Sequence, residues 1–344
     1  MNKRRWVAVG IFGVVVVGSI LVSVMGSSDD QTEKNNLTTV QSILYGSNEL
    51  AENQLEPGDV DKRIVKVTID GTIADTGESS GLFSSEGYNH AFVLQQLQAI
   101  QEDDSIKAVL LEVNSPGGGV YESAELARQI HLIQDKKKAL YVSMQSMAAS
   151  GGYYISASAD KIFATDETIT GSIGVISSSL NYAGLLEKLG LKEQTYKSGA
   201  LKDMNAPTKE PSEEEKNVMQ DYINSSYERF VDIVATGRKL PKETVYKLAD
   251  GRIYDGSQAV KNGLVDEIGY EDQALAALRK DKNLKHAQVF EYGTSSTGFA
   301  QTFFGAKLAQ WQGLTQSPET RLTKVIESIG TQSAPKPMYM YGGE

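Results

Sequence analysis

Runs of apolar residues alternate along the chain with segments in which apolar residues recur every three or four positions. The runs are typical of buried β-strands. They occupy residues 63–73, 105–113, 138–144 and 161–165. Residues 91–103 and 121–135 instead have the spacing of amphipathic helices. Strands that alternate with helices predict an α/β fold with short crossovers.

The chain after Asp203 is predicted to be mainly helical. Ser212 and Glu215 have the spacing of a capping box, and the pattern that follows predicts a long helix ending near Gly237. Such a helix suits the outside of a domain or an interface between copies of the chain. Shorter helices are predicted at 241–249, 257–262 and 271–281.

The N-terminus carries the pattern of a membrane anchor. Residues 6–25 contain no charge and are long enough to span a bilayer as a helix. A cleaved signal peptide has a shorter apolar core and a clear cleavage site, so the pattern favours an uncleaved transmembrane helix. The basic residues in "MNKRR" precede the span, which predicts a single pass with a cytoplasmic N-terminus and the remaining chain outside the cell membrane.

Composition narrows the possible chemistry. The net charge of −10 argues against a nucleic-acid partner, and the absence of cysteine excludes disulfides, thiolate nucleophiles and cysteine-built zinc sites. No cluster of His, Asp or Glu has the spacing of metal ligands, and the glycine-rich segment lacks a nucleotide fingerprint. We therefore expect no metal and no cofactor.

Two glycine-rich segments are candidates for a catalytic site. In "SPGGGVYES", three glycines separate a strand from a helix, which suits either a backbone oxyanion site or an ordinary turn. In "SMAASGGYY", Ser150 follows a strand and is either a nucleophile or a small turn residue.

A serine nucleophile needs a base, and the chain offers few candidates. None of the three histidines, His90, His131 and His286, has a distinctive setting, and packing or solvent-facing roles suit them better. A lysine can serve when burial keeps its amine neutral. The segment "YKSGALKD" contains two lysines, Lys197 and Lys202.

These segments together resemble the signal peptide peptidase A family, peptidase family S49. The shared motifs are "NSPGGGVYES", "SMAASGGYYIS", "TGSIGVI" and "YKSGALKD", in this order, and the resemblance covers roughly residues 60–270. The chain has the length of the short, single-domain form. The resemblance implies a Clp protease/crotonase-like α/β fold and a serine protease with a Ser/Lys dyad.

The family's functional residues carry over onto matching positions of this sequence. Ser150 matches the nucleophile and Lys202 the general base, while Lys197 is its unmatched neighbour. Ser172 matches a serine that hydrogen-bonds the base. Gly118 matches an oxyanion-hole donor, and we infer that the Gly151 N–H, directly after the nucleophile, is the second.

One position departs from the family pattern. The family has glycine where this chain has Gln145, five residues before Ser150. A side chain there would narrow the cleft, or would force an unfavourable φ if that glycine is left-handed. We expect altered activity or specificity rather than none.

The leading functional hypothesis is a membrane-anchored endopeptidase that cleaves apolar peptides, such as signal-peptide remnants after their release. The resemblance implies a homo-oligomer, an octamer as in the short form. Two alternatives remain: a non-catalytic scaffold with the same fold, favoured by Gln145, and a crotonase-like acyl-CoA enzyme, disfavoured by the outward location.

The predicted organisation has six parts. They are a cytoplasmic N-terminus (1–5), a transmembrane anchor (6–25), a polar tether (26–62), the protease domain with C-terminal helices from 212 (63–282), a C-terminal extension (283–333) and a flexible tail (334–344). The tail carries "PMYMY", and an extended peptide of this kind can pair with strand edges in a cleft. We expect it either to enter an active site and be trimmed there or to have no role.

Overall fold

A computed structural model of the chain describes residues 50–75, 88–294 and 337–342. Nearly all of them belong to one compact unit. The predicted anchor at 6–25 lies outside the described residues. Within the described part of the chain, no helix is both long and apolar enough to cross a membrane.

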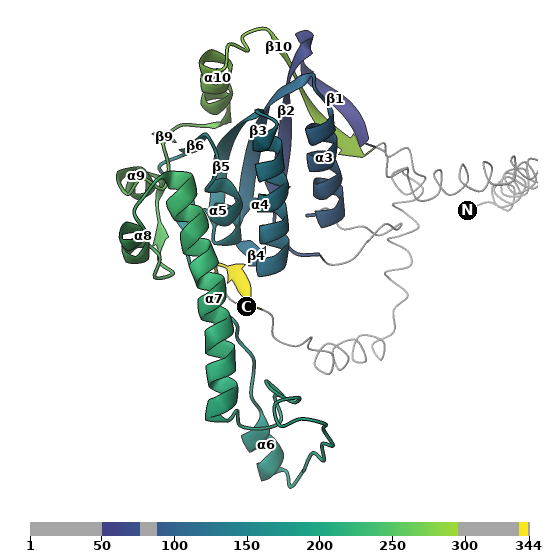
Figure 1. Cartoon of the computed structure of the whole chain (residues 1–344), viewed down its shortest axis with the longest axis vertical. Helices are drawn as coiled ribbons and strands as arrows, with labels where there is room; N and C mark the ends of the chain where they lie inside the picture. Colours follow the sequence, from purple (N-terminus) through teal and green to yellow (C-terminus); the bar gives the residue numbers. More distant parts are fainter. Residues whose placement is uncertain (1–49, 76–87, 295–336, 343–344) are drawn as a thin grey trace, which may run out of the picture. The chain divides into compact units, whose positions relative to one another are not determined.

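A mixed, mainly parallel sheet forms the centre of this unit (Figure 1). Its main path runs β1-β10-β2-β3-β5-β6-β9, and β7 pairs with both β5 and β8. The strands are β1 (Leu50–Glu56), β2 (Asp59–Asp70), β3 (Ile106–Ser115), β5 (Ala139–Ala149), β6 (Lys161–Ala164), β7 (Ile169–Gly171), β8 (Ile253–Tyr254), β9 (Glu267–Ile268) and β10 (Ala287–Thr294). Two further short strands, β4 (Gly117–Gly119) and β11 (Met338–Met340), form a separate pair.

Helices cover both faces of the sheet. The helices are α3 (His90–Glu102), α4 (Val120–Asp135), α5 (Gly151–Ser156), α6 (Ala183–Lys188), α7 (Glu213–Arg238), α8 (Lys242–Leu248), α9 (Gly256–Lys261) and α10 (Glu271–Asp281). Along β2, Val65 and Val67 point into the core beneath α3 and α4, while Ile64 points into a second core beneath α10. This alternation with a period of two is what buries a strand on both faces.

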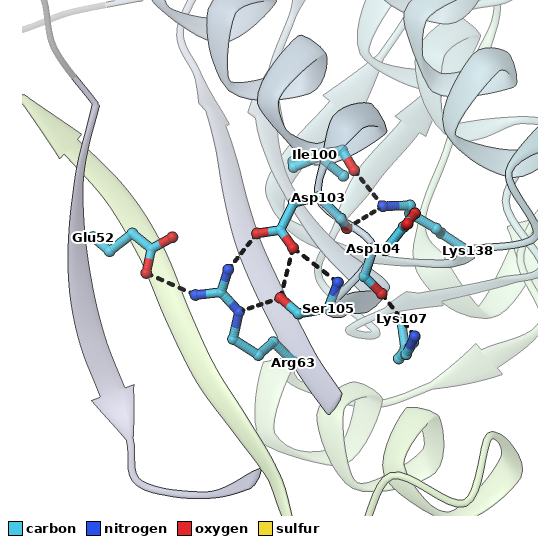
Figure 2. A network of polar contacts seen from close by, with 8 residues as sticks. All are labelled: Glu52, Arg63, Ile100, Asp103, Asp104, Ser105, Lys107 and Lys138. Atoms are coloured by element: carbon cyan, nitrogen blue, oxygen red, sulfur yellow. Dashed lines mark hydrogen bonds and ion pairs between the residues drawn. The ribbon is translucent and has the colours of Figure 1, made fainter. Parts of the chain in front are cut away.

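A polar network ties together the N-terminal ends of the central strands (Figure 2). The Arg63 guanidinium on β2 donates to the Glu52 carboxylate at 2.7 Å and also pairs with Asp103, just before β3. The buried Lys138 ammonium, just before β5, donates to the carbonyl oxygens of Ile100 and Asp103. Burial lowers the pKa of Lys138. The Arg63 charge is thus paired with carboxylates and the Lys138 ammonium is bound by carbonyl oxygens, and both hold together the end of the sheet where the strands begin.

Helix α7 forms an arm that extends past the sheet in Figure 1, with α6 near its first turn. The capping box predicted for Ser212 and Glu215 is confirmed. Only Glu215 is buried between residues 213 and 225, whereas Phe230 and Val234 are part of the main core. The arm and its loops expose many large apolar side chains: Leu180, Leu185, Leu189, Leu191, Tyr196, Val218 and Tyr222.

The strands and helices predicted from the sequence are present, but the folded unit extends further than 63–282. β1 lies within the predicted tether and β10 within the predicted extension, and both join the sheet. The sequence does not predict β1, because this strand is mostly polar and exposed and shows no alternation of apolar residues. Residues 338–340 of the predicted flexible tail form β11. The three glycines that the sequence predicts as a loop form the strand β4, because their backbone pairs with β11 on one edge and with Ile73 on the other.

Candidate active site

Ser150 lies at the C-terminal end of β5, where the chain turns into α5. It is the N-cap of that helix, with φ 52° and ψ −114°, and is 1% exposed. Its N–H donates to the Gly171 carbonyl of β7 at 2.8 Å, which helps to hold the turn. A serine with positive φ is uncommon, and surrounding structure must stabilise such a conformation. The sharp turn therefore presents Ser150 at the edge where the parallel strands end.

The N–H groups of Gly118 and Gly151 lie close together beside Ser150. A Cβ built on Gly151 would be 3.1 Å from the Gly118 nitrogen. On one edge of β4, Ile73 donates to the Gly117 carbonyl and accepts from the Gly119 N–H, both at 2.8 Å. Because N–H directions alternate along a strand, the Gly118 N–H points from the opposite edge. Two backbone N–H groups thus lie close together beside Ser150.

Close contacts explain why side chains are excluded at this site. A Cβ on Gly118 would lie 1.9 Å from the Ile73 carbonyl oxygen, which no side chain can tolerate. A Cβ on Gly151 would lie 2.6 Å from the Ser123 Oγ, a buried hydroxyl with no hydrogen-bond partner among the described residues. Ser123 was not identified from the sequence, since nothing in the helical pattern of α4 distinguishes it.

The C-terminal strand β11 lies along the free edge of β4. The two strands are antiparallel, with Tyr339 opposite Gly118. The Tyr341 N–H donates to the Pro116 carbonyl at 2.8 Å. On the other edge of β11, Met338 exchanges two hydrogen bonds with Ile176, at 2.8 and 3.1 Å. The segment is therefore bound on both edges, by β4 on one side and by Ile176 on the other, as an extended peptide would be.

The register places the Tyr339 carbonyl at the two glycine N–H groups. Hydrogen-bonded pairs alternate along an antiparallel ladder, so Tyr339 and Gly118 form the next such pair after Tyr341 and Pro116. A Cβ built on Gly117 would lie 1.9 Å from the Tyr339 carbonyl oxygen and 2.6 Å from the Gly151 nitrogen, so these two atoms are close to each other. The Tyr339 carbonyl thus lies beside the backbone nitrogens of Gly118 and Gly151.

The Tyr339 side chain fills a pocket between α5 and α7. It is fully buried, with its ring centroid 4.8 Å from that of Tyr154 and 4.7 Å from that of Phe230. Its hydroxyl donates to the Ser226 carbonyl at 2.9 Å. Burial raises the pKa of Tyr339. Nothing in the sequence marks these pocket residues, because they come from two helices far apart in the chain, α5 and α7.

Ser172 lies next to Ser150 through the pairing of β5 and β7. It follows Gly171, which pairs with Ala149 and accepts the Ser150 N–H. Ser172 also has positive φ, 49°, and its N–H donates to the Arg252 carbonyl at 2.8 Å. It lines a cavity of about 500 Å³ whose wall includes residues 340–342. The structure thus brings together Ser150, Ser172, Gly118 and Gly151.

Lys202 belongs to the loop at the end of the arm. Its side chain is exposed and makes no hydrogen bond or ion pair within the described ranges. The next residue, Asp203, accepts from Lys197 at 2.7 Å and from Lys209 at 2.8 Å, which lowers its pKa to about 2. Lys209 also pairs with Glu215 in the first turn of α7 at 2.5 Å. The Lys202 loop is thereby attached to the first turn of α7.

That attachment keeps Lys202 away from Ser150 of the same chain. Ser226, whose carbonyl binds the Tyr339 hydroxyl, lies about 16 Å along α7 from Glu215 at 1.5 Å per residue. In Figure 1 the segment between α6 and α7 lies at the end of α7 remote from α5. A single chain therefore does not bring Lys202 and Ser150 together.

Gln145 is accommodated without backbone strain. It is absent from the residues with positive φ, so its backbone does not need glycine. Its side-chain amide donates to the Glu112 carboxylate on β3. Its backbone carbonyl accepts from the Thr168 hydroxyl at 2.8 Å. The expectation of a forced φ is wrong, and the side chain is held by Glu112.

The three histidines have other surroundings. His90 is buried and bridges Tyr88 and Glu125, at 2.5 and 3.0 Å from its two ring nitrogens. His131 and His286 are exposed. None of the three makes a hydrogen bond to Ser150 within the part of the chain that the structure describes.

The models of two protein families match the chain. The model of "Peptidase family S49" matches residues 133–285, and that of "Clp protease" matches residues 84–169. A protein of Enterococcus faecium named "Putative signal peptide peptidase SppA" is 54% identical over 344 residues, which cover all of both chains.

Two more distant relatives are also named as proteases. "Putative protease MJ0651" of Methanocaldococcus jannaschii is 39% identical over 73% of this chain and 82% of its own. "Protease 4" of Haemophilus influenzae is 35% identical over 84% of this chain and 48% of its own. The chain, with its α/β Clp protease-like fold, belongs to peptidase family S49, the signal peptide peptidase A family of serine peptidases.

Proposed function

We propose that the protein is a membrane-anchored endopeptidase that cleaves apolar peptides with a Ser150–Lys202 dyad. The observation that carries this proposal is the position of β11. An extended segment lies in the groove between β4 and Ile176, and its Tyr339 carbonyl faces the N–H groups beside Ser150. A substrate bound in the same way would have its carbonyl carbon next to the nucleophile.

The proposed reaction is acyl transfer. The Ser150 hydroxyl attacks the carbonyl carbon while the neutral Lys202 amine takes its proton, and Ser172 orients that amine. The carbonyl oxygen becomes negative and accepts hydrogen bonds from the Gly118 and Gly151 N–H groups. The C–N bond then breaks as the lysine gives the proton to the leaving amine. Water, activated by the same lysine, hydrolyses the acyl ester and restores Ser150.

In this proposal Lys202 is supplied by a second copy of the chain. The arm holds Lys202 at the far end of α7, and it exposes large apolar side chains such as Leu189 and Leu191, at 63% and 56%. Exposed apolar surface of this extent is typical of an interface. A closed ring in which each arm reaches the next copy satisfies both observations, and the octamer implied by the resemblance is one such ring.

Location and substrate follow from the N-terminal sequence. Residues 6–25 are uncharged and follow a basic segment, which supports a single-pass anchor with the catalytic domain outside the cell membrane. An enzyme placed there meets apolar segments released from the bilayer, and signal-peptide remnants are the substrates we propose. The relative from Enterococcus faecium carries the corresponding name.

The test is hydrolysis of an apolar fluorogenic peptide by full-length variants. We expect Ser150→Ala and Lys202→Ala each to lower kcat/KM by on the order of 10³-fold or more. Lys197→Ala is the matched control: its ammonium only ties the exposed loop, through the Ala200 carbonyl and Asp203. An exposed pair contributes at most about 1 kcal/mol, so the loss should stay below about fivefold.

Labelling with a serine-reactive phosphonate separates the proposed enzyme from a scaffold or an acyl-CoA enzyme. We expect one modified residue, Ser150, and no label on Ser150→Ala. Absence of label on the wild-type chain, or equal loss of activity in Lys197→Ala and Lys202→Ala, would contradict the proposed dyad.

A further inference from the structure

Lysine side chains gather at the end of the sheet where the parallel strands begin. There a cavity of about 880 Å³ is lined by six lysines and by two aspartates, Asp104 and Asp160. Six positive and two negative charges leave an excess of four, in a chain whose net charge is −10. Together the lysines form what we call the lysine surface: Lys62, Lys107, Lys136, Lys137, Lys138 and Lys282.

Only part of the lysine surface is used within the fold. Lys138 is buried and donates to two carbonyl oxygens at the end of α3 (Figure 2). Lys107 donates to a backbone carbonyl at 2.7 Å, and Lys282 donates to the Asp160 carboxylate at 3.1 Å. Three others are exposed, and their ammonium groups make no hydrogen bond or ion pair within the described ranges: Lys62, Lys136 and Lys137. Their positive charges face solvent.

Lys137 occupies a backbone position that favours glycine. It follows the end of α4, its φ is 63°, and its N–H donates to the Gln134 carbonyl at 2.8 Å. Glycine is the usual residue at such a helix end, because side chains are disfavoured in the left-handed region. The Lys137 side chain makes no polar contact in the described part of the chain that offsets this cost. What a lysine adds at this position is its charge.

We propose that the lysine surface binds the phosphate headgroups of an anionic lipid bilayer. The inference rests on the proposed function, because the anchor at residues 6–25 would hold the domain beside a membrane. The headgroups of that membrane are then the nearest dense array of phosphates. A lysine binds phosphate as a compact charge on a flexible stem, so an array of mobile headgroups needs no fixed geometry to engage it.

The lysine surface and the catalytic groove lie at opposite ends of the sheet. Lys107 lies at the start of β3 and Ser115 at its end, about 26 Å away at 3.3 Å per residue. Ser115 pairs with Ala148 on β5, two residues before Ser150. A domain docked through its lysines therefore directs the groove away from the bilayer, towards peptides that have left it. Docking should leave the hydrolysis of a soluble peptide unchanged.

Charge removal gives the expected size of the effect. Each lysine close to an anionic bilayer strengthens association about fivefold. Lys136→Gln combined with Lys137→Asn should therefore weaken docking about 25-fold, and asparagine tolerates the positive φ, so this double variant should fold. The matched control is Lys247→Gln combined with Lys261→Gln, which removes two exposed lysines in the last turns of α8 and α9. It should change docking less than about twofold.

The experiment uses the full-length chain in vesicles of phosphatidylcholine or of an equal mixture with phosphatidylglycerol. A membrane-impermeant reagent acetylates lysines, and mass spectrometry gives each rate relative to Lys216 on α7. We expect Lys62, Lys107 and Lys282 to react at least about fivefold more slowly in the mixed vesicles. About 1 M NaCl should remove this protection, because the Debye length falls to about 3 Å.

Three results would overturn the proposal. They are equal acetylation rates in the two kinds of vesicle, the same protection by inorganic phosphate without vesicles, and undiminished protection in Lys136→Gln/Lys137→Asn. The first would show that headgroup charge has no effect, and the second would reduce the surface to a site for small anions. The third would place the interaction elsewhere on the chain.

Flotation separates failure of the lysine surface from failure of the anchor. The anchor predicts that the chain floats with pure phosphatidylcholine vesicles and stays with them in about 1 M NaCl. If it does not float there, but mixed vesicles still protect the lysines at low salt, the proposed anchoring fails and the surface stands. If it floats with both kinds of vesicle and the lysines react equally, the surface assignment is wrong and the anchor stands.

Discussion

Release of the C-terminal strand from the groove should activate the enzyme. β11 lies along β4 where a substrate would have to pair, so the tail and a peptide cannot occupy that edge together. The tail is part of the same chain, and its effective concentration at the groove is high. We therefore expect Tyr339→Ala in the full-length enzyme to increase the rate at which an added peptide is hydrolysed.

The magnitude follows from the buried contacts of Tyr339. Burying an aromatic side chain contributes about 1.5–3 kcal/mol, and its hydrogen bond to Ser226 adds about 1 kcal/mol. The ring contacts with Tyr154 and Phe230 bring the total to roughly 3–5 kcal/mol. This shifts the equilibrium between docked and free tail by about 10² to several 10³. The rate should rise towards that of a chain lacking residues 334–344.

The assay is the initial rate of hydrolysis at a peptide concentration below KM, with the intact mass of the enzyme measured on the same sample. Tyr341→Ala is the matched control: Tyr341 is only half-buried, and the contact it makes with Pro116 is through its backbone N–H. We expect little change in that variant, and we expect Ser150→Ala to retain an uncut C-terminus. Equal rates for the wild type and Tyr339→Ala, both with complete tails, would refute the reasoning.

Three further changes test other parts of the account. Gly118→Ala should abolish hydrolysis and lower the melting temperature, because its Cβ would lie 1.9 Å from the Ile73 carbonyl; an active variant would contradict the placement of this donor. Asp203→Asn should lower the melting temperature at neutral pH. Hydrogen bonds from Lys197 and Lys209 lower the pKa of Asp203 to about 2. The contribution of Asp203 to folding stability is therefore present above about pH 4 and disappears as the pH falls through about 2. If the difference in melting temperature between the wild type and Asp203→Asn instead grew as the pH fell, this assignment would be contradicted. Gln145→Gly should change the melting temperature more than kcat/KM, since Gln145 binds Glu112; broadened peptide specificity would instead place it in the cleft.

Local patterns in the sequence were sufficient for the parts of the fold built from nearby residues. The capping box at Ser212 and the helix at 271–281 depend on hydrogen bonds within a few residues, and both are confirmed. β10 depends instead on pairing with β2, more than two hundred positions earlier in the chain. The sequence pattern therefore predicts only a C-terminal extension there. The three glycines of β4 form a strand for the same reason, because Ile73 pairs with one edge of β4 and Tyr339 with the other.

The candidate site shows the same division. Motif resemblance indicated Ser150, Ser172, Gly118 and Gly151, and the structure places all four at one end of the sheet. The pocket formed by Tyr154, Phe230 and Ser226 had no sequence signal, because an aromatic residue at helical spacing reads as ordinary core. The separation of Lys202 from Ser150 could not be inferred either, since it depends on the length and direction of α7.

Mixing two inactive chains tests the central proposal, a Ser150–Lys202 dyad shared between copies. Full-length Ser150→Ala and Lys202→Ala are prepared separately and together in the same cells, and peptide hydrolysis is measured per chain. Each variant alone should be inactive. In a randomly mixed ring, about one site in four receives an intact serine from one copy and an intact lysine from the next, so about a quarter of the wild-type activity should return. No recovery in mixed rings whose composition is verified by mass spectrometry would contradict the shared dyad.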